Sequence, residues 1–142
     1  MGNVEKVDTT LIEHLLNDGF IPVIATVGMD ENGIAYNINA DTAAAAIAIA
    51  LHAEKFVSMT DIVGLLYDKD DESTLIPEVE ISEIEGYKAH GVISGGMIPK
   101  VDCCVEAVRS GVDSAIILDG RVAHSILIEL LSDAGIGTML VH

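Results

Sequence analysis

The sequence predicts an α/β fold with a mostly parallel sheet and helices on both of its faces. Short apolar runs rich in β-branched residues alternate along the 142 residues with segments whose apolar side chains recur at helical spacing. This alternation is typical of strands joined by crossover helices, which build parallel sheets. Because 50% of the residues are hydrophobic, a chain of this length can bury its own core, so we expect residues 1–142 to form a single domain.

The first third of the chain predicts a helix, a strand and a hairpin. Residues 8–19 begin with Asp8 as a candidate N-cap and end at Gly19, with apolar residues at helical spacing between them. Residues 20–28, FIPVIATVG, form a continuous apolar run, which is typical of a strand covered on both faces. The Asn-Gly pair within residues 29–36 favours a tight turn into a short returning strand.

The remaining segments continue the alternation. Residues 37–55 predict an alanine-rich helix that can pack closely on a sheet, and residues 56–61 predict a second strand. Residues 62–82 mix short apolar pieces with acidic residues, which predicts a loop carrying two small strands. The elements expected after this loop are a short polar helix at 82–91, a helix at 99–111, a strand at 113–120, a helix at 123–135 and a last strand at 136–141.

Charge and composition argue against several classes of protein. Seven lysines and arginines against 23 aspartates and glutamates give a formal net charge of -16, which repels nucleic acids and anionic membranes. Cys103 and Cys104 are neighbours and do not suit a loop-closing disulfide, and the longest apolar stretch, AAAAIAIAL, is about half of a membrane span. The histidines show no metal-binding spacing. We therefore expect a cytoplasmic protein with no metal site, no nucleic acid partner and no membrane partner.

Three segments follow the ends of predicted strands or open predicted helices, which is where α/β sheets bind ligands. They are Tyr36–Asp41, Met59–Gly64 and Ser94–Lys100. The first two segments also have structural explanations, because Asn39 or Asp41 can cap a helix and a Thr-Asp pair can form a turn. The sequence leaves both explanations open for these two segments.

Lys100 points more clearly to a ligand. A cation in the first turn of a helix meets the positive end of the helix dipole, which is unfavourable unless an anion is nearby. Gly95 and Gly96 precede it and offer bare backbone N–H groups that suit phosphate oxygens. The motifs G-x-x-x-x-G-K-[ST] and G-x-G-x-x-G are absent, so neither a Walker loop nor a dinucleotide fingerprint is present. A flexible glycine loop that ends in lysine is the structural alternative.

Five segments occur in an order that resembles one known family: YNINADTAAAAIA, TDIVGLL, GVISGGMIPKV, ILDGRVAHSILIELL and GIGTML. Over residues 4–141 they resemble the carboxyl-terminal half of the acetylglutamate kinases, members of the amino acid kinase family. The resemblance implies a three-layer αβα sandwich. It also implies that the γ-phosphoryl group of ATP, bound with Mg²⁺, passes to the side-chain carboxylate of N-acetyl-L-glutamate in arginine biosynthesis.

The resemblance implies roles for particular residues. Lys100 would stabilise the transferring phosphoryl group, and Asp41 would orient the catalytic lysines. Asn37 and Asn39 would lie between the two substrates. The residues that would hold the nucleotide are Thr60, Asp61, Ile62, Gly64, Leu66, Val92, Ile93 and Ser94. An effector arginine would meet His124, Glu129 and Gly135, although Ala134 stands where an acidic residue is common; exposed polar residues at a helix end are the structural alternative.

The resemblance leaves the amino-terminal half of the family without a counterpart, including a glycine-rich loop and a second catalytic lysine. We therefore expect a nucleotide-binding half that is inactive alone. In the complete enzyme, ATP, ADP and N-acetyl-L-glutamate would be its ligands, arginine an effector, and further copies of the chain its partners in a homo-oligomer. The alternative is a non-catalytic regulatory or oligomerisation domain that binds nucleotide or arginine.

Overall fold

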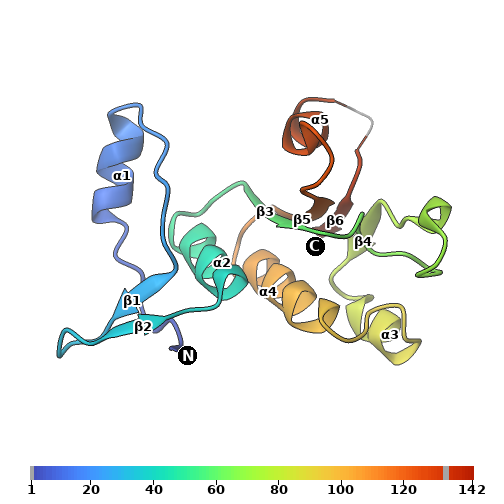
Figure 1. Ribbon diagram of the computed structural model, residues 1–142, viewed down its shortest axis with the longest axis horizontal. Coiled ribbons are helices and arrows are strands. Elements are labelled where there is room, and N and C mark those ends of the chain that lie inside the picture. The colour runs from blue at the N-terminus through green and yellow to red at the C-terminus, as the bar shows by residue number, and fades with distance from the viewer. Residues whose placement is uncertain (1, 133–134) are drawn as a thin grey trace.

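A four-stranded sheet with the order β3-β5-β6-β4 lies at the centre of the computed structural model, which describes residues 2–132 and 135–142 (Figure 1). Its strands are β3 (Lys55–Thr60), β4 (Glu78–Glu80), β5 (Ser114–Asp119) and β6 (Thr138–Val141). β3 pairs with β5 and β4 with β6 in parallel, whereas β5 and β6 run antiparallel. The predicted α/β class with a mostly parallel sheet is confirmed, and the antiparallel pair is an addition to it.

Helices cover both faces of this sheet. The helices α2 (Ala40–Ala50), α3 (Ile84–Ala89) and α4 (Met97–Arg109) lie on one side, and α5 (Ser125–Leu131) lies on the other (Figure 1). α4 packs on β3, β5 and β6, α2 packs on β3, and α5 packs on β5. The three-layer arrangement is therefore confirmed.

The core lies between the sheet and the layer formed by α2, α3 and α4. Every residue of β5 is buried, because this strand has a neighbour at each edge and helices over each face. Ala45 and Ala48 of α2 belong to the same core cluster, which confirms the close packing expected of an alanine-rich helix. Val101 and Val108 of α4 are fully buried there as well.

The helices α2 and α4 begin at positions other than those predicted. α2 begins at Ala40 rather than residue 37, because Asn39 is its N-cap and the Oδ1 atom of Asn39 accepts a hydrogen bond from the N–H of Thr42 at 3.2 Å. α4 begins at Met97 and contains Pro99 within its first turn, where a missing N–H costs no helical hydrogen bond.

Three other segments are shorter than predicted. The loop at 62–82 contains one strand, β4, and the 3-10 helix η1 (Glu72–Thr74), whereas the second predicted strand is reduced to an isolated bridge between Leu66 and Leu75. The helix predicted at 123–135 is α5, which ends at Leu131. The last predicted strand is β6, which begins at Thr138.

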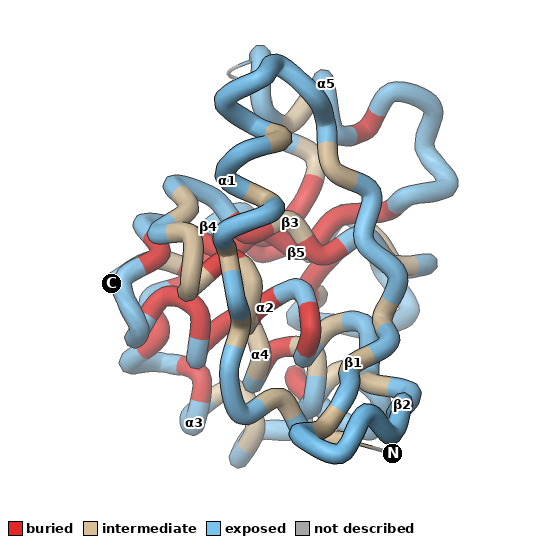
Figure 2. Tube along the Cα trace, turned by 90° about the vertical axis from the view of Figure 1, so that its left-hand side faces the viewer, coloured by how far each residue is buried: buried red, intermediate tan, exposed pale blue. Residues whose placement is uncertain are grey.

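The amino-terminal part of the chain departs most from the prediction. The helix α1 (Thr10–Asn17) lies where a helix was predicted, although its N-cap is Thr9 rather than Asp8. The antiparallel hairpin of β1 (Val27–Met29) and β2 (Ala35–Asn37) is as expected. The prediction of a buried strand over the whole of residues 20–28 is wrong, because residues 20–26 pair with no strand. Figure 2 shows this part of the chain as exposed or half-buried, and the first buried residue along the described chain is Ala43. An apolar strand needs covering layers, and this chain provides none for that segment.

Candidate active site

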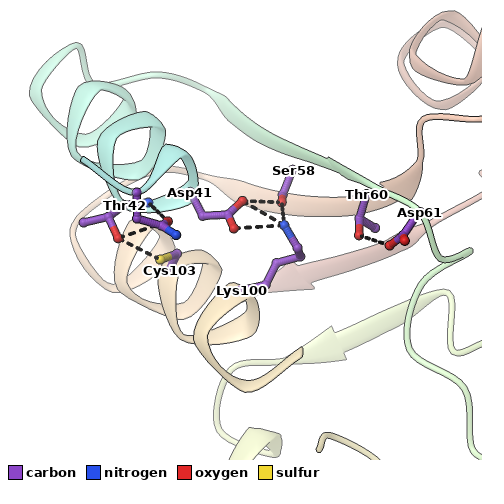
Figure 3. Close-up of polar contacts among 8 residues, drawn as sticks. Asp41, Thr42, Ser58, Thr60, Asp61, Lys100 and Cys103 are labelled. Carbon is purple, nitrogen blue, oxygen red and sulfur yellow. Dashed lines mark hydrogen bonds and ion pairs between the residues drawn. The ribbon is translucent and has the colours of Figure 1, made fainter. Parts of the chain in front are cut away.

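Three elements converge toward the carboxyl end of β3. Ser58 lies on β3, Asp41 lies in the first turn of α2, and Lys100 lies in the first turn of α4 (Figure 3). α2 and α4 pack against each other and both pack on β3. This packing brings together Asp41 and Lys100, which are 59 positions apart in the sequence.

Lys100 is held by an ion pair and a hydroxyl group. Its Nζ atom lies 2.8 and 3.0 Å from the two carboxylate oxygens of Asp41 and 3.3 Å from Oγ of Ser58. The Ser58 hydroxyl is also within 3.3 Å of Oδ1 of Asp41. The side chains of Lys100 and Asp41 are 16% and 31% exposed, so the ammonium group is fixed in place but still reachable from solvent.

Unpaired backbone N–H groups lie directly before α4, the helix that carries Lys100. Within the described residues, the N–H groups of Gly95 and Gly96 have no hydrogen-bond partner. Gly95 has φ +56°, a conformation that favours glycine, and a Cβ atom added at either position would meet nothing within 4 Å. The approach to this helix start is therefore open. A fixed ammonium group and free N–H groups at the amino end of the same helix are features that suit anion binding.

The two asparagines predicted to contact substrate have different surroundings. The side chain of Asn39 caps α2 through Thr42, so the structural explanation of this residue is correct as far as its contacts go. Asn37 is the last residue of β2; its side chain is exposed and makes no hydrogen bond within the described part of the chain. Their roles in substrate binding stay predictions.

The residues predicted to hold a nucleotide lie in two segments that are tied together. The hydroxyl groups of Tyr67 and Tyr87 are 3.1 Å apart, and the carbonyl oxygen of Tyr87 accepts hydrogen bonds from the N–H groups of Val92 and Ile93 at 3.0 and 3.3 Å. The segment after β3 therefore contacts the segment before α4. This link was not predicted, and the only signal for it in the sequence is that two of the three tyrosines lie near these segments.

The eight residues predicted to hold the nucleotide differ in whether their side chains are exposed. The Ile93 side chain is part of the core, and a Cβ atom on Gly64 would collide with Oγ1 of Thr138, so at both positions a ligand could meet only the backbone. Thr60 is half-buried, and its Oγ1 atom lies 3.3 Å from Oδ1 of Asp61 (Figure 3). Asp61 and Ser94 are exposed, whereas Ile62, Leu66 and Val92 are half-buried.

Asp119 is a charged residue at the carboxyl end of β5, next to the carboxyl end of β3, and it was not predicted from the sequence. It ends β5 and is paired in register with Thr60, and its side chain is only 7% exposed. The Nε and Nη2 atoms of Arg121 donate hydrogen bonds to the Asp119 carboxylate at 3.0 and 2.8 Å. These side-chain bonds, and then the bond from the backbone N–H of Arg121, lower the pKa of Asp119 below its usual value. An aspartate directly after an apolar strand was the available sequence signal.

Replacing Arg121 with methionine is expected to raise the pKa of Asp119 toward its usual value. Because the pKa of Asp119 is depressed in the folded state, its contribution to stability is present above the unfolded-state pKa and is lost as pH falls through the folded-state pKa. The variant should therefore unfold at a higher pH during acid titration. Carbon-13 NMR of the carboxyl groups measures the pKa directly. Arg109→Met, which removes an exposed charge at the end of α4, should leave the pKa of Asp119 unchanged.

The predicted effector residues lie around α5. His124 is its exposed N-cap residue and has φ +61°. Oε2 of Glu129 accepts hydrogen bonds from the N–H groups of Ile136 and Gly137 at 2.7 and 3.2 Å, which closes the connection from α5 to β6. Gly135 lies near this carboxylate, and Ala134 is outside the described residues. The contacts give Glu129 a structural role, and arginine binding stays a prediction.

The two cysteines do not have the properties of nucleophiles. Burial raises the pKa of both thiols, that of Cys104 to about 12, so both are protonated at neutral pH. Across residues 2–132 and 135–142, no group of three or more histidine, cysteine, aspartate or glutamate side chains is placed to hold a metal ion. No helix in the same ranges is both long and apolar enough to cross a bilayer.

Comparison with known proteins decides the family. A model of the amino acid kinase family matches residues 1–119. The chain belongs to the amino acid kinase family. Among its relatives in this family, the acetylglutamate kinase of Brachyspira hyodysenteriae is 53% identical over 139 residues, which are 98% of this chain and 48% of that protein. The acetylglutamate kinase of Actinobacillus pleuropneumoniae is 58% identical over 130 residues, which are 92% of this chain and 46% of that protein.

This amino acid kinase chain spans about half the length of the curated relatives it matches. A solved structure with the same fold is N-acetylglutamate synthase from Neisseria gonorrhoeae, complexed with coenzyme A and N-acetyl-glutamate. It superposes with a TM-score of 0.90 at 29% identity, over 99% of this chain and 32% of that one. The family predicted from the five sequence segments is confirmed.

Proposed function

We propose that this chain is the nucleotide-binding half of an acetylglutamate kinase, which transfers the γ-phosphoryl group of ATP to the side-chain carboxylate of N-acetyl-L-glutamate. One observation carries the proposal: Asp41 and Ser58 hold the ammonium group of Lys100 in the first turn of α4, and the free N–H groups of Gly95 and Gly96 precede the same helix. The names of the relatives supply the reaction, and the site geometry fits its phosphate chemistry.

Lys100 is the group we assign to the transferring phosphoryl group. Two of its contacts are to the Asp41 carboxylate, and the third, to Ser58, is the longest. A phosphoryl oxygen can take the place of the Ser58 hydroxyl while Asp41 keeps the ammonium group in position. Charge that develops on the phosphoryl oxygens then meets a cation that does not have to reorganise. Asp41 is thus a positioning residue, and the free N–H groups add further donors.

A fixed cation is needed at this place because the rest of the chain repels the substrate. The formal net charge of -16 disfavours a polyphosphate at long range, whereas a local ammonium group and a helix start favour it at contact distance. Magnesium would arrive with ATP as part of the substrate, held by phosphate oxygens and a few protein oxygens. The exposed Asp61 carboxylate and the Asp41 carboxylate, which is 31% exposed, can supply such oxygens.

Nucleotide binding tests the proposal without requiring catalysis. MgADP at 100 times its dissociation constant should stabilise the chain against urea by about 2.7 kcal/mol, since only the folded state binds it. Mg²⁺ alone should give no such shift, and the isolated chain should form no ADP from ATP and N-acetyl-L-glutamate. A chain that arginine stabilises and that neither MgADP nor MgATP stabilises at millimolar concentration would contradict the proposal and favour a regulatory domain.

A further inference from the structure

Two tyrosines join the two segments that would hold the nucleotide. Tyr67 directly follows the segment after β3, and Tyr87 lies in α3, shortly before the segment that leads to α4. Their hydroxyl oxygens are 3.1 Å apart, so one hydroxyl group donates a hydrogen bond and the other accepts it. The ring centroids are 6.0 Å apart with the ring planes tilted by 54°, which lies within the favourable range for aromatic pairs.

The backbones of the two segments are anchored to different parts of the fold. In the segment after β3, the N–H group of Leu65 donates a hydrogen bond to Oγ1 of Thr138, next to the sheet. In the segment before α4, the N–H groups of Val92 and Ile93 donate to the carbonyl oxygen of Tyr87, at the end of α3. Neither anchor by itself fixes the distance between the two segments.

The tyrosine pair is placed to fix that distance. Within the described chain, it is the one side-chain hydrogen bond that joins residues 61–67 to residues 84–94. Tyr67 is 63% exposed, so water can replace this bond and the bond adds little to the stability of the fold. An exposed bond that contributes little to folding can still decide how two ligand-binding segments are spaced.

We propose that Tyr67 and Tyr87 are positioning residues that hold the two segments at the spacing that a bound nucleotide requires. This role rests on the proposed function, because it takes residues 60–66 and 92–94 as the segments that contact ATP. Neither tyrosine has to touch the nucleotide. When both sides of a site are already spaced correctly in the free chain, binding does not have to order them, and the affinity is higher.

The phosphate end of the site does not depend on this pair. Lys100 is held by Asp41 and Ser58, and none of these three residues forms a hydrogen bond with either tyrosine in the structure as described. The pair should therefore affect how tightly the nucleotide binds rather than the transfer of its phosphoryl group. In an acetylglutamate kinase assembled from this chain and the complementary part of a relative, loss of the pair should raise KM for ATP and leave kcat nearly unchanged.

Titration of the chain with MgADP tests this role without requiring catalysis. Tyr67→Phe and Tyr87→Phe each remove one hydroxyl group and keep the ring. Each should raise the dissociation constant for MgADP, measured by calorimetry, by about three- to tenfold, because a smaller fraction of the free chain has the correct spacing. The double variant should raise it no further than either single variant, since all three break the same bond. The urea midpoint of the ligand-free chain should change little.

Ser110→Ala is the control variant. It removes a hydroxyl group that lies 3.3 Å from the Glu106 carboxylate, at the opposite end of α4 from Lys100, and it should leave the dissociation constant unchanged.

The outcomes separate the positioning role from the proposed function. If the unsubstituted chain binds MgADP and the phenylalanine variants bind it equally well, the positioning role is wrong and the proposed function stands. Additive effects of the two substitutions, or a fall in the urea midpoint that accompanies the loss of affinity, would also overturn the positioning role. If the unsubstituted chain does not bind MgADP, the proposed function fails and the positioning role fails with it.

Discussion

In an acetylglutamate kinase reconstituted, as proposed, from this chain and the complementary part of a relative, replacing Lys100 with methionine should lower the turnover number by about 10²- to 10³-fold. Methionine keeps much of the length of the side chain but removes the ammonium group that Asp41 and Ser58 hold. The Michaelis constant for ATP should change less, because charge on the phosphoryl oxygens is largest in the transition state. A coupled assay of ADP release gives both quantities.

The matched control for this prediction is Lys55→Met. Lys55 is exposed. It is the first residue of β3, so it lies at the opposite end of this strand from the site where Asp41 and Lys100 meet. Both variants remove one positive charge from a very acidic chain, and both can be compared for stabilisation by MgADP. Equal turnover numbers for the two variants would show that Lys100 acts only through the net charge of the chain. Lys100 would then not be a catalytic residue.

Replacing Gly137 with alanine should destabilise the fold by about 3 kcal/mol, the upper part of the range for overpacked buried sites. Gly137 is buried directly before β6, and a Cβ atom there would collide with the backbone carbonyl oxygen of Ile117 and lie 3.0 Å from Cβ of Leu118. Backbone atoms cannot turn away as a side chain can. The substitution would therefore push β6 away from β5, where Ile117 pairs with Thr138.

Gly86→Ala is the control for this stability prediction. Gly86 is an exposed residue inside α3, and a Cβ atom there would meet nothing within 4 Å. Alanine should stabilise this helix by about 0.5–1 kcal/mol, because glycine loses more backbone entropy in a helix. Urea titrations followed by circular dichroism compare the two variants. If Gly137→Ala does not lower the urea midpoint by more than the small change that Gly86→Ala causes, then β6 is not packed against β5 as closely as described.

Local patterns in the sequence predicted the carboxyl-terminal two thirds of the fold well. The helical spacing of residues 99–111 and the apolar run at 113–120 became α4 and β5, whose packing depends on those same side chains. The pairing of strands could not be predicted in the same way. The antiparallel contact of β5 with β6 depends on which edges meet after the helices have packed, and no residue within either strand specifies that choice.

The residues of the candidate site also fall into those that a local pattern predicted and those that it did not. Lys100 was predicted from its own surroundings, as a cation at the start of a helix after two glycines. Ser58 and Asp119 were missed, because a serine inside a strand has no distinctive local pattern and an aspartate at the end of an apolar strand does not by itself indicate which residue it will pair with. Their importance comes from neighbours that are distant in the sequence.

By itself the sequence determined the α/β class and the place of the lysine, since both follow from residue types at short spacing, and it determined the family through the resemblance of five segments along the chain. Only the tertiary structure decided that Asp41 and Ser58 hold that lysine, because α2, α4 and β3 must first pack together. It also decided that residues 20–26 stay exposed. Their apolar pattern specifies a covered strand, but a strand is covered only when partner strands and helices are present to pack on it.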